Sequence, residues 1–393
     1  MRRNSNLAPG KNHFVVLDGL RGVASLIVVI FHLCETYSFG DPVRQVINHG
    51  YLAVDFFFLL SGFVIAYAYD DRWGRMSQWE FYKRRLIRLQ PMVVMGSLIG
   101  AALFYFQAHG SFPLVSSTPI WELLLVMLVG FTLLPLPTSV DIRGWEEMHP
   151  LNGPAWSLFF EYIGNILYAT GLRKLSNTAL MVLVLLAAGY LIEVAIFNGR
   201  GDVIGGWSLN PQQLHIGFAR LLFPFLAGIW LMRSGIRIPM RGAFVVSSVL
   251  LIGVLSSPRF GGHEHLWVNG LYEALCVIIV FPVIVAIGAG EKRLDGTSLR
   301  VALFFGDLSY PLYITHYPLI YLYTGWVVEN KIPVARGAGV GLLTLIVTVT
   351  IAFACFRLYD VPVRTWLTRR FLSRSVESQS GASKEPRRAL GDT

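Results

Sequence analysis

The sequence predicts an all-α polytopic membrane protein with about ten transmembrane helices. Of its 393 residues, 54% are hydrophobic and only 15% are charged, whereas soluble domains carry about 25% charged residues. Hydrophobic runs of roughly 17 residues or more, long enough for a membrane-spanning helix, recur along the chain. The basic residues gather at alternate ends of these runs, as in multi-pass membrane proteins.

Short polar or basic turns separate the ten expected spans, which cover residues 17–36, 51–69, 89–108, 154–172, 178–197, 214–232, 242–257, 267–289, 303–325 and 336–357. A further apolar piece, 119–136, contains Trp121 and Glu122 and runs into Leu-Pro-Leu-Pro at 134–137. We expect it to be re-entrant or interfacial, a form tolerated where protein or water covers the backbone.

The charge distribution places both termini in the cytoplasm. On this topology only seven of the 33 lysines and arginines fall on the outer half, namely Arg44, Arg143, Arg200, Arg220, Arg259, Lys331 and Arg336. The excess inside follows the positive-inside rule. It accounts for the net charge of +9 without a nucleic-acid partner.

The expected domain organisation is one membrane domain, residues 1–372, followed by a polar cytoplasmic tail, 373–393. The tail is rich in Ser, Gly and charged residues, a composition typical of disorder. The N-terminal apolar segment has no signal-peptide cleavage pattern. The three cysteines, Cys34, Cys276 and Cys355, all lie in apolar spans, so we expect neither disulfides nor a metal site.

Arg21 and His32 are the most informative residues, because both lie inside the first hydrophobic span. Eleven residues make about three helical turns, so the two side chains share a face roughly 16 Å apart along the axis. An ionisable side chain in a span costs about 3 kcal/mol or more and usually faces a bundle interior or wet cavity. This stripe therefore predicts chemistry or transport within the membrane.

Other ionisable residues extend the pattern. Asp55 is expected near the outer end of the second span, beside His32, with Glu161 two turns into the fourth span and His316 mid-membrane in the ninth. At the cytoplasmic entrance of the third span, Arg85 and Arg88 are spaced i, i+3 and can hold one phosphate together. A cationic inner entrance thus leads toward a deeper cluster of histidine and acids.

Each of these residues also has a structural interpretation. The arginines can anchor the topology on lipid headgroups, Arg21 can snorkel to the inner face, and the acids and His316 can be satisfied packing partners. His32 is hardest to explain in this way, because a histidine beside buried acids suits proton transfer. His13, His49, His109, His149, His263 and His265 lie in loops, and no metal centre is expected there.

Several segments together resemble the integral-membrane acyltransferase 3 family, whose members O-acylate polysaccharides and antibiotics. The segments follow the family's order and cover the chain to about residue 370: LDGLRGVASLIVVIFH, VDFFFLLSGFVI, RRLIRLQP, PAWSLFFEY, ARLLFPFLAGIWL and LSYPLYITHYPL. Arg21 and His32 match the family's Arg-x10-His pair, and Arg85 and Arg88 its Arg-x-x-Arg motif. Glu161 matches the acid of its Trp-Ser-Leu-x-x-Glu motif.

The resemblance implies transfer of an acyl group, usually acetyl from acetyl-CoA, to a hydroxyl of a carbohydrate or lipid-linked glycan. It implies a location in the bacterial cytoplasmic (inner) membrane, among membrane lipids. The chain lacks the C-terminal periplasmic domain of one branch of the family, so the stand-alone type is expected.

On this hypothesis Arg21, Arg85 and Arg88 bind the acyl-CoA, and His32 is the general base, oriented by Asp55 or Glu161. Substrate-binding candidates are Tyr310 and His316, and these two residues and Tyr313 are the candidates for the oxyanion partner. An acyl-enzyme on His32, Ser61 or Ser309 stays open. So does a different class, a proton-coupled transporter of a sugar or lipid, because buried His, Asp and Glu also form proton relays.

Overall fold

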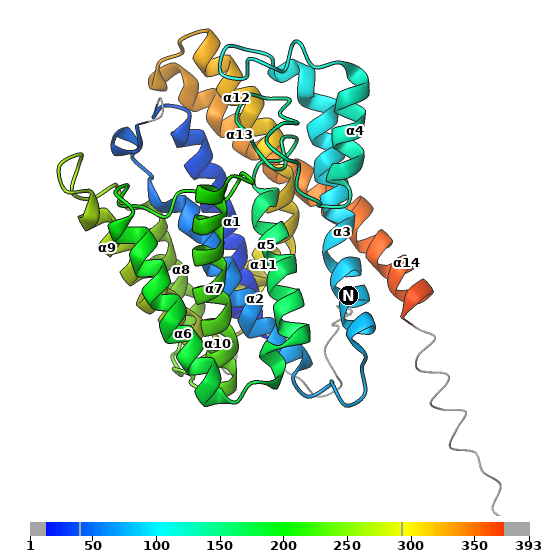
Figure 1. The fold of residues 1–393 in the computed structure, drawn as a ribbon, viewed down its shortest axis with the longest axis vertical. Helices are drawn as coiled ribbons and strands as arrows, with labels where there is room; N and C mark the ends of the chain where they lie inside the picture. Colours follow the sequence, from blue (N-terminus) through cyan, green and yellow to red (C-terminus); the bar gives the residue numbers. More distant parts are fainter. Residues whose placement is uncertain (1–12, 39–40, 292–293, 373–393) are drawn as a thin grey trace, which may run out of the picture.

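The structure, a computed structural model, describes residues 13–38, 41–291 and 294–372. These residues form a bundle of helices joined by loops, without a β-strand in the described ranges (Figure 1). The expected all-α class is confirmed. The helices are α1 (Val15–Glu35), α2 (Ala53–Tyr69), α3 (Gln78–Leu103), α4 (Ile120–Gly130), α5 (Ala155–Thr170), α6 (Asn177–Ile192), α7 (Pro211–Ser234), α8 (Ala243–Ser256), α9 (Leu266–Leu275), α10 (Phe281–Gly290), α11 (Gly296–Thr315), α12 (Tyr317–Glu329), α13 (Val334–Cys355) and α14 (Val361–Phe371).

Seven continuous helical stretches of the described chain are long and apolar enough to cross a membrane. They contain α1, α2, α3, α6, α7, α9 joined to α10, and α13 joined to α14, while α4 and α8 are apolar but shorter. The protein is therefore a multi-pass membrane protein. The count of ten spans and the cytoplasmic termini stay predictions, and the tail 373–393 lies outside the described residues.

The segment expected to be re-entrant contains one helix of eleven residues, α4, beside the upper part of α3 (Figure 1). Eleven residues are about half the length that crosses a bilayer. The chain then continues as a non-helical loop, 131–154, whose Met148, His149 and Asn152 are buried. Backbone of this kind is tolerated at membrane depth when protein covers it, which supports the expected form of this segment.

Two helix pairs form the centre of the bundle, α1 with α11 and α2 with α7. Glycines allow the backbones to approach closely, as at many membrane helix interfaces. A Cβ added at Gly22 of α1 would lie 2.1 Å from the Phe305 carbonyl oxygen, and one at Gly228 of α7 would lie 2.1 Å from that of Leu59. These contacts fix the depth of α1 and α2 relative to their partners.

The ninth expected span is broken into α11 and α12 at His316. Pro318 has no N–H to bond the carbonyl of Ile314, four residues earlier. Asn152 of the 131–154 loop donates from Nδ2 to that oxygen at 2.8 Å instead. The break therefore places His316 at a helix junction and ties the loop to it.

Candidate active site

His32 lies in the last turn of α1, and its ring nitrogen Nδ1 is 2.7 Å from Oε2 of Glu35, three residues on. A carboxylate only accepts, so Nδ1 carries a hydrogen, and in the neutral ring Nε2 then has the lone pair. The His32 side chain is 16% exposed and that of Glu35 is 45% exposed. This arrangement holds the imidazole in the tautomer that a general base needs.

His316 stacks on His32, with ring centroids 5.5 Å apart and planes 26° from parallel. Its Nδ1 donates to the carbonyl of Tyr313 at 2.8 Å, which leaves Nε2 as an acceptor. That Nε2 is buried and has no hydrogen-bond partner among the described residues. Buried polar atoms are normally paired, so this nitrogen has spare capacity for a substrate hydroxyl beside His32.

Tyr317 and Tyr321 of α12 connect His32 to the 131–154 loop. The Tyr317 ring lies 4.7 Å from the His32 ring and 4.5 Å from that of Tyr321. The Tyr321 hydroxyl donates to both carboxylate oxygens of Glu147, at 2.8 and 2.6 Å. Burial raises the pKa of Glu147 to about 7, although nearby Arg143 and the Tyr321 hydrogen bond act the other way.

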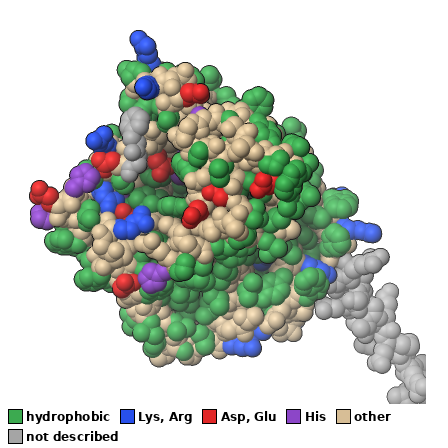
Figure 2. All heavy atoms as spheres, turned by 45° about the horizontal axis from the view of Figure 1, so that its top comes forward, with side chains coloured by type: hydrophobic (Ala, Val, Ile, Leu, Met, Phe, Trp, Pro, Cys, Tyr) green, Lys and Arg blue, Asp and Glu red, His purple; other side chains and the backbone are tan. Residues whose placement is uncertain are grey.

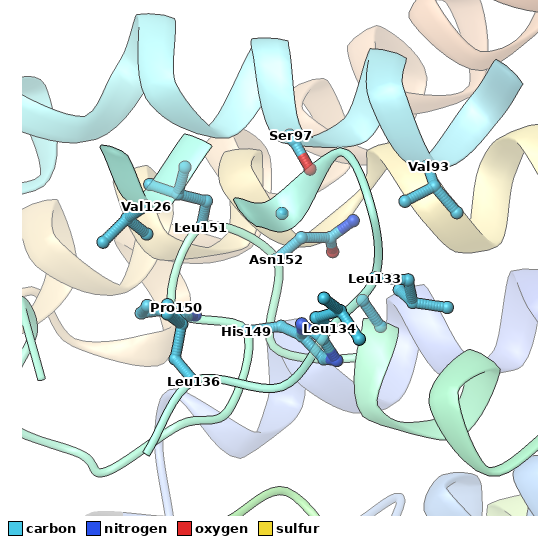
Figure 3. Close-up of a pocket in the computed structure, with 12 residues that line it drawn as sticks. Val93, Ser97, Val126, Leu133, Leu134, Leu136, His149, Pro150, Leu151 and Asn152 are labelled. Carbon is cyan, nitrogen blue, oxygen red and sulfur yellow. The ribbon is translucent and has the colours of Figure 1, made fainter. Parts of the chain in front are cut away.

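A small cavity lies behind this loop, between α3 and α4, with a volume of about 20 Å³. Figure 3 shows the side chains of Ser97, His149 and Asn152 around it. Burial lowers the pKa of His149 to about 3, so its ring is neutral. The space suits a water molecule, and His32 is not among the residues that line it.

A second cluster forms around the inner parts of α1, α3 and α5. Arg85 donates to Oε1 of Glu161 at 2.5 Å, and the Ser61 hydroxyl donates to the same oxygen at 3.0 Å. Arg21 lies 3.8 Å from Asp18 and within electrostatic range of Arg85, Arg88 and Glu161. The three arginines predicted to bind the donor are therefore brought together, and Glu161 belongs to their end of the bundle.

Aromatic and hydroxyl side chains occupy the depth between the two clusters. The Tyr313 hydroxyl is 2.7 Å from Ser157 Oγ, and its ring lies 5.4 Å from that of Phe57 and 5.9 Å from that of His316. Ser157 is one turn from Glu161 on α5, and Phe57 is one turn from Ser61 on α2. A line of side chains thus joins the arginines to His32.

Asp55 makes a different contact from the expected one with His32. Its carboxylate accepts from Arg220 of α7 at 2.7 Å, and both side chains are almost fully buried. Arg220 also donates to the Tyr51 carbonyl at 2.7 Å. Among the described residues the carboxylate that bonds His32 is thus Glu35, whereas Asp55 and Glu161 are each held by an arginine.

The two candidate substrate-binding residues lie at different depths. His316 is beside His32, whereas the Tyr310 hydroxyl donates to the Leu89 carbonyl of α3 at 2.6 Å and lies near Arg88 and Glu161. Sequence reasoning missed Glu35, although its i, i+3 spacing from His32 is a readable signal. It also missed Glu147, which no local pattern connects to the site.

The end of the molecule that is uppermost in Figure 1 is hollowed and carries both acidic and basic side chains, while hydrophobic side chains cover its flanks (Figure 2). The residues that the structure describes contain no group of three or more His, Cys, Asp or Glu side chains placed to hold a metal ion. The side chains that the structure brings together here are histidines, carboxylates, tyrosines and arginines.

Comparisons with known proteins agree with this arrangement. The family model described as "Acyltransferase domain" matches residues 14–357. "Protein 2 in picA locus" of Rhizobium radiobacter is 35% identical over 196 residues, 47% of this chain and 96% of its own length. Acyltransferase MdmB of Streptomyces mycarofaciens is 27% identical, over 77% of this chain and 78% of its own.

O-acetyltransferase OatA of Staphylococcus aureus (strain NCTC 8325 / PS 47) is 25% identical over 374 residues, 88% of this chain, which spans 57% of OatA. No solved structure matches. The family match extends from the start of α1 to the end of α13 and includes both clusters. The chain therefore belongs to the integral-membrane acyltransferase 3 family and is an acyltransferase.

Proposed function

We propose that this protein transfers an acyl group, acetyl by preference, from acyl-CoA to a hydroxyl of a carbohydrate or lipid-linked glycan, with His32 as general base. The observation that carries this proposal is the pairing of His32 with Glu35 beside the unpartnered His316. The relative named O-acetyltransferase OatA supports the choice of acetyl.

The inner arginines suit a phosphate-bearing donor. Within the described part of the chain Arg88 makes no hydrogen bond, and Nε atoms of Arg84 and Arg85 are buried without partners. Guanidinium groups bind phosphates through paired, charge-assisted hydrogen bonds. Bound acyl-CoA supplies the activated thioester, and we assign Arg21, Arg85 and Arg88 to its phosphate end.

His32 acts on the acceptor. Its Nε2 takes the hydroxyl proton while the oxygen bonds to the acyl carbon and the carbon–sulfur bond breaks. The proton then passes to the leaving thiolate. Glu35 holds Nδ1–H and stabilises the imidazolium, as the aspartate does in a catalytic triad. His316 accepts a second hydrogen bond from the acceptor and so orients it.

Arg21 of the inner cluster and His32 lie on one helix, α1, roughly 16 Å apart by helical rise. With the expected topology, the donor enters from the cytoplasm and its thin arm follows the line through Tyr313 to His32. The acceptor then reaches His32 from the outer face of a bacterial cytoplasmic membrane. Membrane lipids surround the bundle, and no nucleic acid takes part.

The test uses protein purified in detergent, with acetyl-CoA binding measured by calorimetry and turnover by release of free thiol. We expect wild type to bind and to release thiol faster when an acceptor glycan is added. Arg88→Ala should weaken binding, and it breaks no hydrogen bond of the described structure. If wild type has no affinity for acetyl-CoA and moves a sugar unmodified, the transporter interpretation replaces this proposal.

A further inference from the structure

A fourth arginine reaches the inner cluster from the far end of the chain. Arg364 lies in the first turn of α14, which packs against α3. It is bonded to Asp360 at 2.7 Å, and its side chain is only 21% exposed. None of the motifs that identify the donor-binding arginines contains it.

Arg364 lies close to Arg88. Arg88, Tyr310 and Asp307 are all within electrostatic range of Arg364, and α14, which carries Arg364, packs against α3, which carries Arg88. Tyr310 in turn is within electrostatic range of Arg88, Glu161 and Asp360. Arg364 is in range of Arg88, and Arg88 and Arg85 are in range of Arg21, so these four arginines from three helices lie toward one end of the bundle.

Three carboxylates here are each paired with a basic side chain, although Oδ1 of Asp360 is buried without a hydrogen-bond partner in the described chain. Glu161 is bonded to Arg85, and Asp360 is bonded to Arg364. Asp18 is 2.9 Å from His13 and 3.8 Å from Arg21. Arg88 is left without a bonded acid among the described residues, beside another guanidinium. Like charges brought together away from bulk water repel strongly, so the arrangement favours an added anion.

Unused hydrogen-bond donors point to the same conclusion. The Nε of Arg364 is buried and has no partner in the described chain, and Arg88 donates no hydrogen bond there. Two guanidiniums with free N–H groups match a phosphate, which presents several acceptor oxygens and up to two negative charges.

We propose that Arg364 and Arg88 together form a phosphate-binding site, which holds a phosphate of the acyl-CoA and makes α14 part of the donor site. This rests on the proposed acyl-CoA donor. It assigns a function to a helix that follows the family match, which ends at residue 357. A phospholipid headgroup offers the same chemistry, and the two sources are separated by the experiment.

The experiment measures thiol release by purified wild type, Arg364→Gln and Arg364→Lys with two donors, acetyl-CoA and acetyl-pantetheine, which lacks phosphate. Loss of one charge-assisted contact corresponds to about a tenfold change in affinity. We expect Arg364→Gln to raise KM for acetyl-CoA about tenfold and leave kcat and the KM for acetyl-pantetheine unchanged. Arg364→Lys, which keeps the charge, should give an intermediate KM.

The matched control is Arg370→Gln, an exposed arginine in the last turn of the same helix, which should behave as wild type. Equal effects of Arg364→Gln on both donors would show a structural role and overturn the proposal. Unchanged KM values for both donors would also overturn it, because a site that holds a lipid headgroup and not the donor leaves both values unaffected. If wild type itself does not use acetyl-CoA, the proposed function fails before this step.

Discussion

Two polar pairs beside Tyr51, His32 with Glu35 and Asp55 with Arg220, differ in how completely they are satisfied. The Tyr51 ring packs against Phe31, next to His32, and the Tyr51 carbonyl accepts from Arg220. In the second pair both side chains are at most 2% exposed and bonded on several sides. In the first, Glu35 is 45% exposed and the stacked His316 keeps an unpartnered nitrogen.

This difference distinguishes a pair that supports the structure from a pair that can take part in the reaction. A saturated buried pair has no hydrogen-bonding capacity left for a substrate, and removing one partner leaves an uncompensated charge. A partly exposed histidine beside an unpartnered acceptor can bind and deprotonate a ligand. We therefore infer that Asp55 supports the bundle and that His32 carries the reaction, although both were predicted to be catalytic.

His32→Ala should have the largest effect on activity. Without the base, thiol release in the presence of acceptor is expected to fall by about 10²–10⁴-fold. The midpoint of thermal unfolding should change less than in Asp55→Asn, because the variant loses ring contacts with His316 and Tyr317 and one hydrogen bond to a part-exposed neighbour but leaves no buried charge unpaired. Steady-state rates and melting curves on one preparation check both statements. If the variant loses stability and keeps its rate of thiol release, the His32–Glu35 pair does not differ from the Asp55–Arg220 pair in the way proposed.

Asp55→Asn should have the largest effect on stability. It leaves the buried Arg220 charge without its carboxylate, a change that costs about 3 kcal/mol or more. The check is thermal unfolding in detergent. The matched control is Asp41→Asn, since its partner Arg44 is 69% exposed and such solvent-accessible pairs contribute at most about 1 kcal/mol. Similar unfolding temperatures for the two variants would contradict the assignment.

Glu35→Gln should reduce kcat moderately. The amide loses the negative charge that stabilises the imidazolium, a difference of about 1.4 kcal/mol or less for a solvent-screened pair and thus up to about tenfold in rate. Donor affinity should not change, because Glu35 lies at the opposite end of α1 from the arginines. A rate equal to that of wild type would show that the carboxylate does not orient His32.

Glu147→Gln should change the pH dependence of stability more than it changes the activity at a single pH. The folded protein raises the pKa of Glu147 from 4.5 to about 7, so ionisation opposes folding. Stability contributed by this group is full below pH 4.5 and is lost as pH rises toward 7. Wild type should therefore melt at a lower temperature at pH 8 than at pH 5, and the variant should show a smaller difference. If the variant and wild type show the same difference in melting temperature between pH 5 and pH 8, Glu147 is not the cause of that difference.

The sequence predicted most of the helices, because membrane spans depend on local hydrophobicity. It also located His32 and the inner arginines, because a charge in an apolar run is unusual. The contacts of Asp55, Glu147 and Arg364 were not predictable, since each depends on a helix or loop distant in sequence. The break at His316 had a readable cause in Pro318, but its consequence, the contact with Asn152, required the fold.

Donor binding and thiol release, measured together on His32→Ala, test the central claim most directly. The two functions are assigned to opposite ends of α1, so a change at His32 should separate them. We predict that the variant binds acetyl-CoA with wild-type affinity and releases almost no thiol when acceptor is present. Thiol release at the wild-type rate, or loss of acetyl-CoA binding together with activity, would contradict the role assigned to His32.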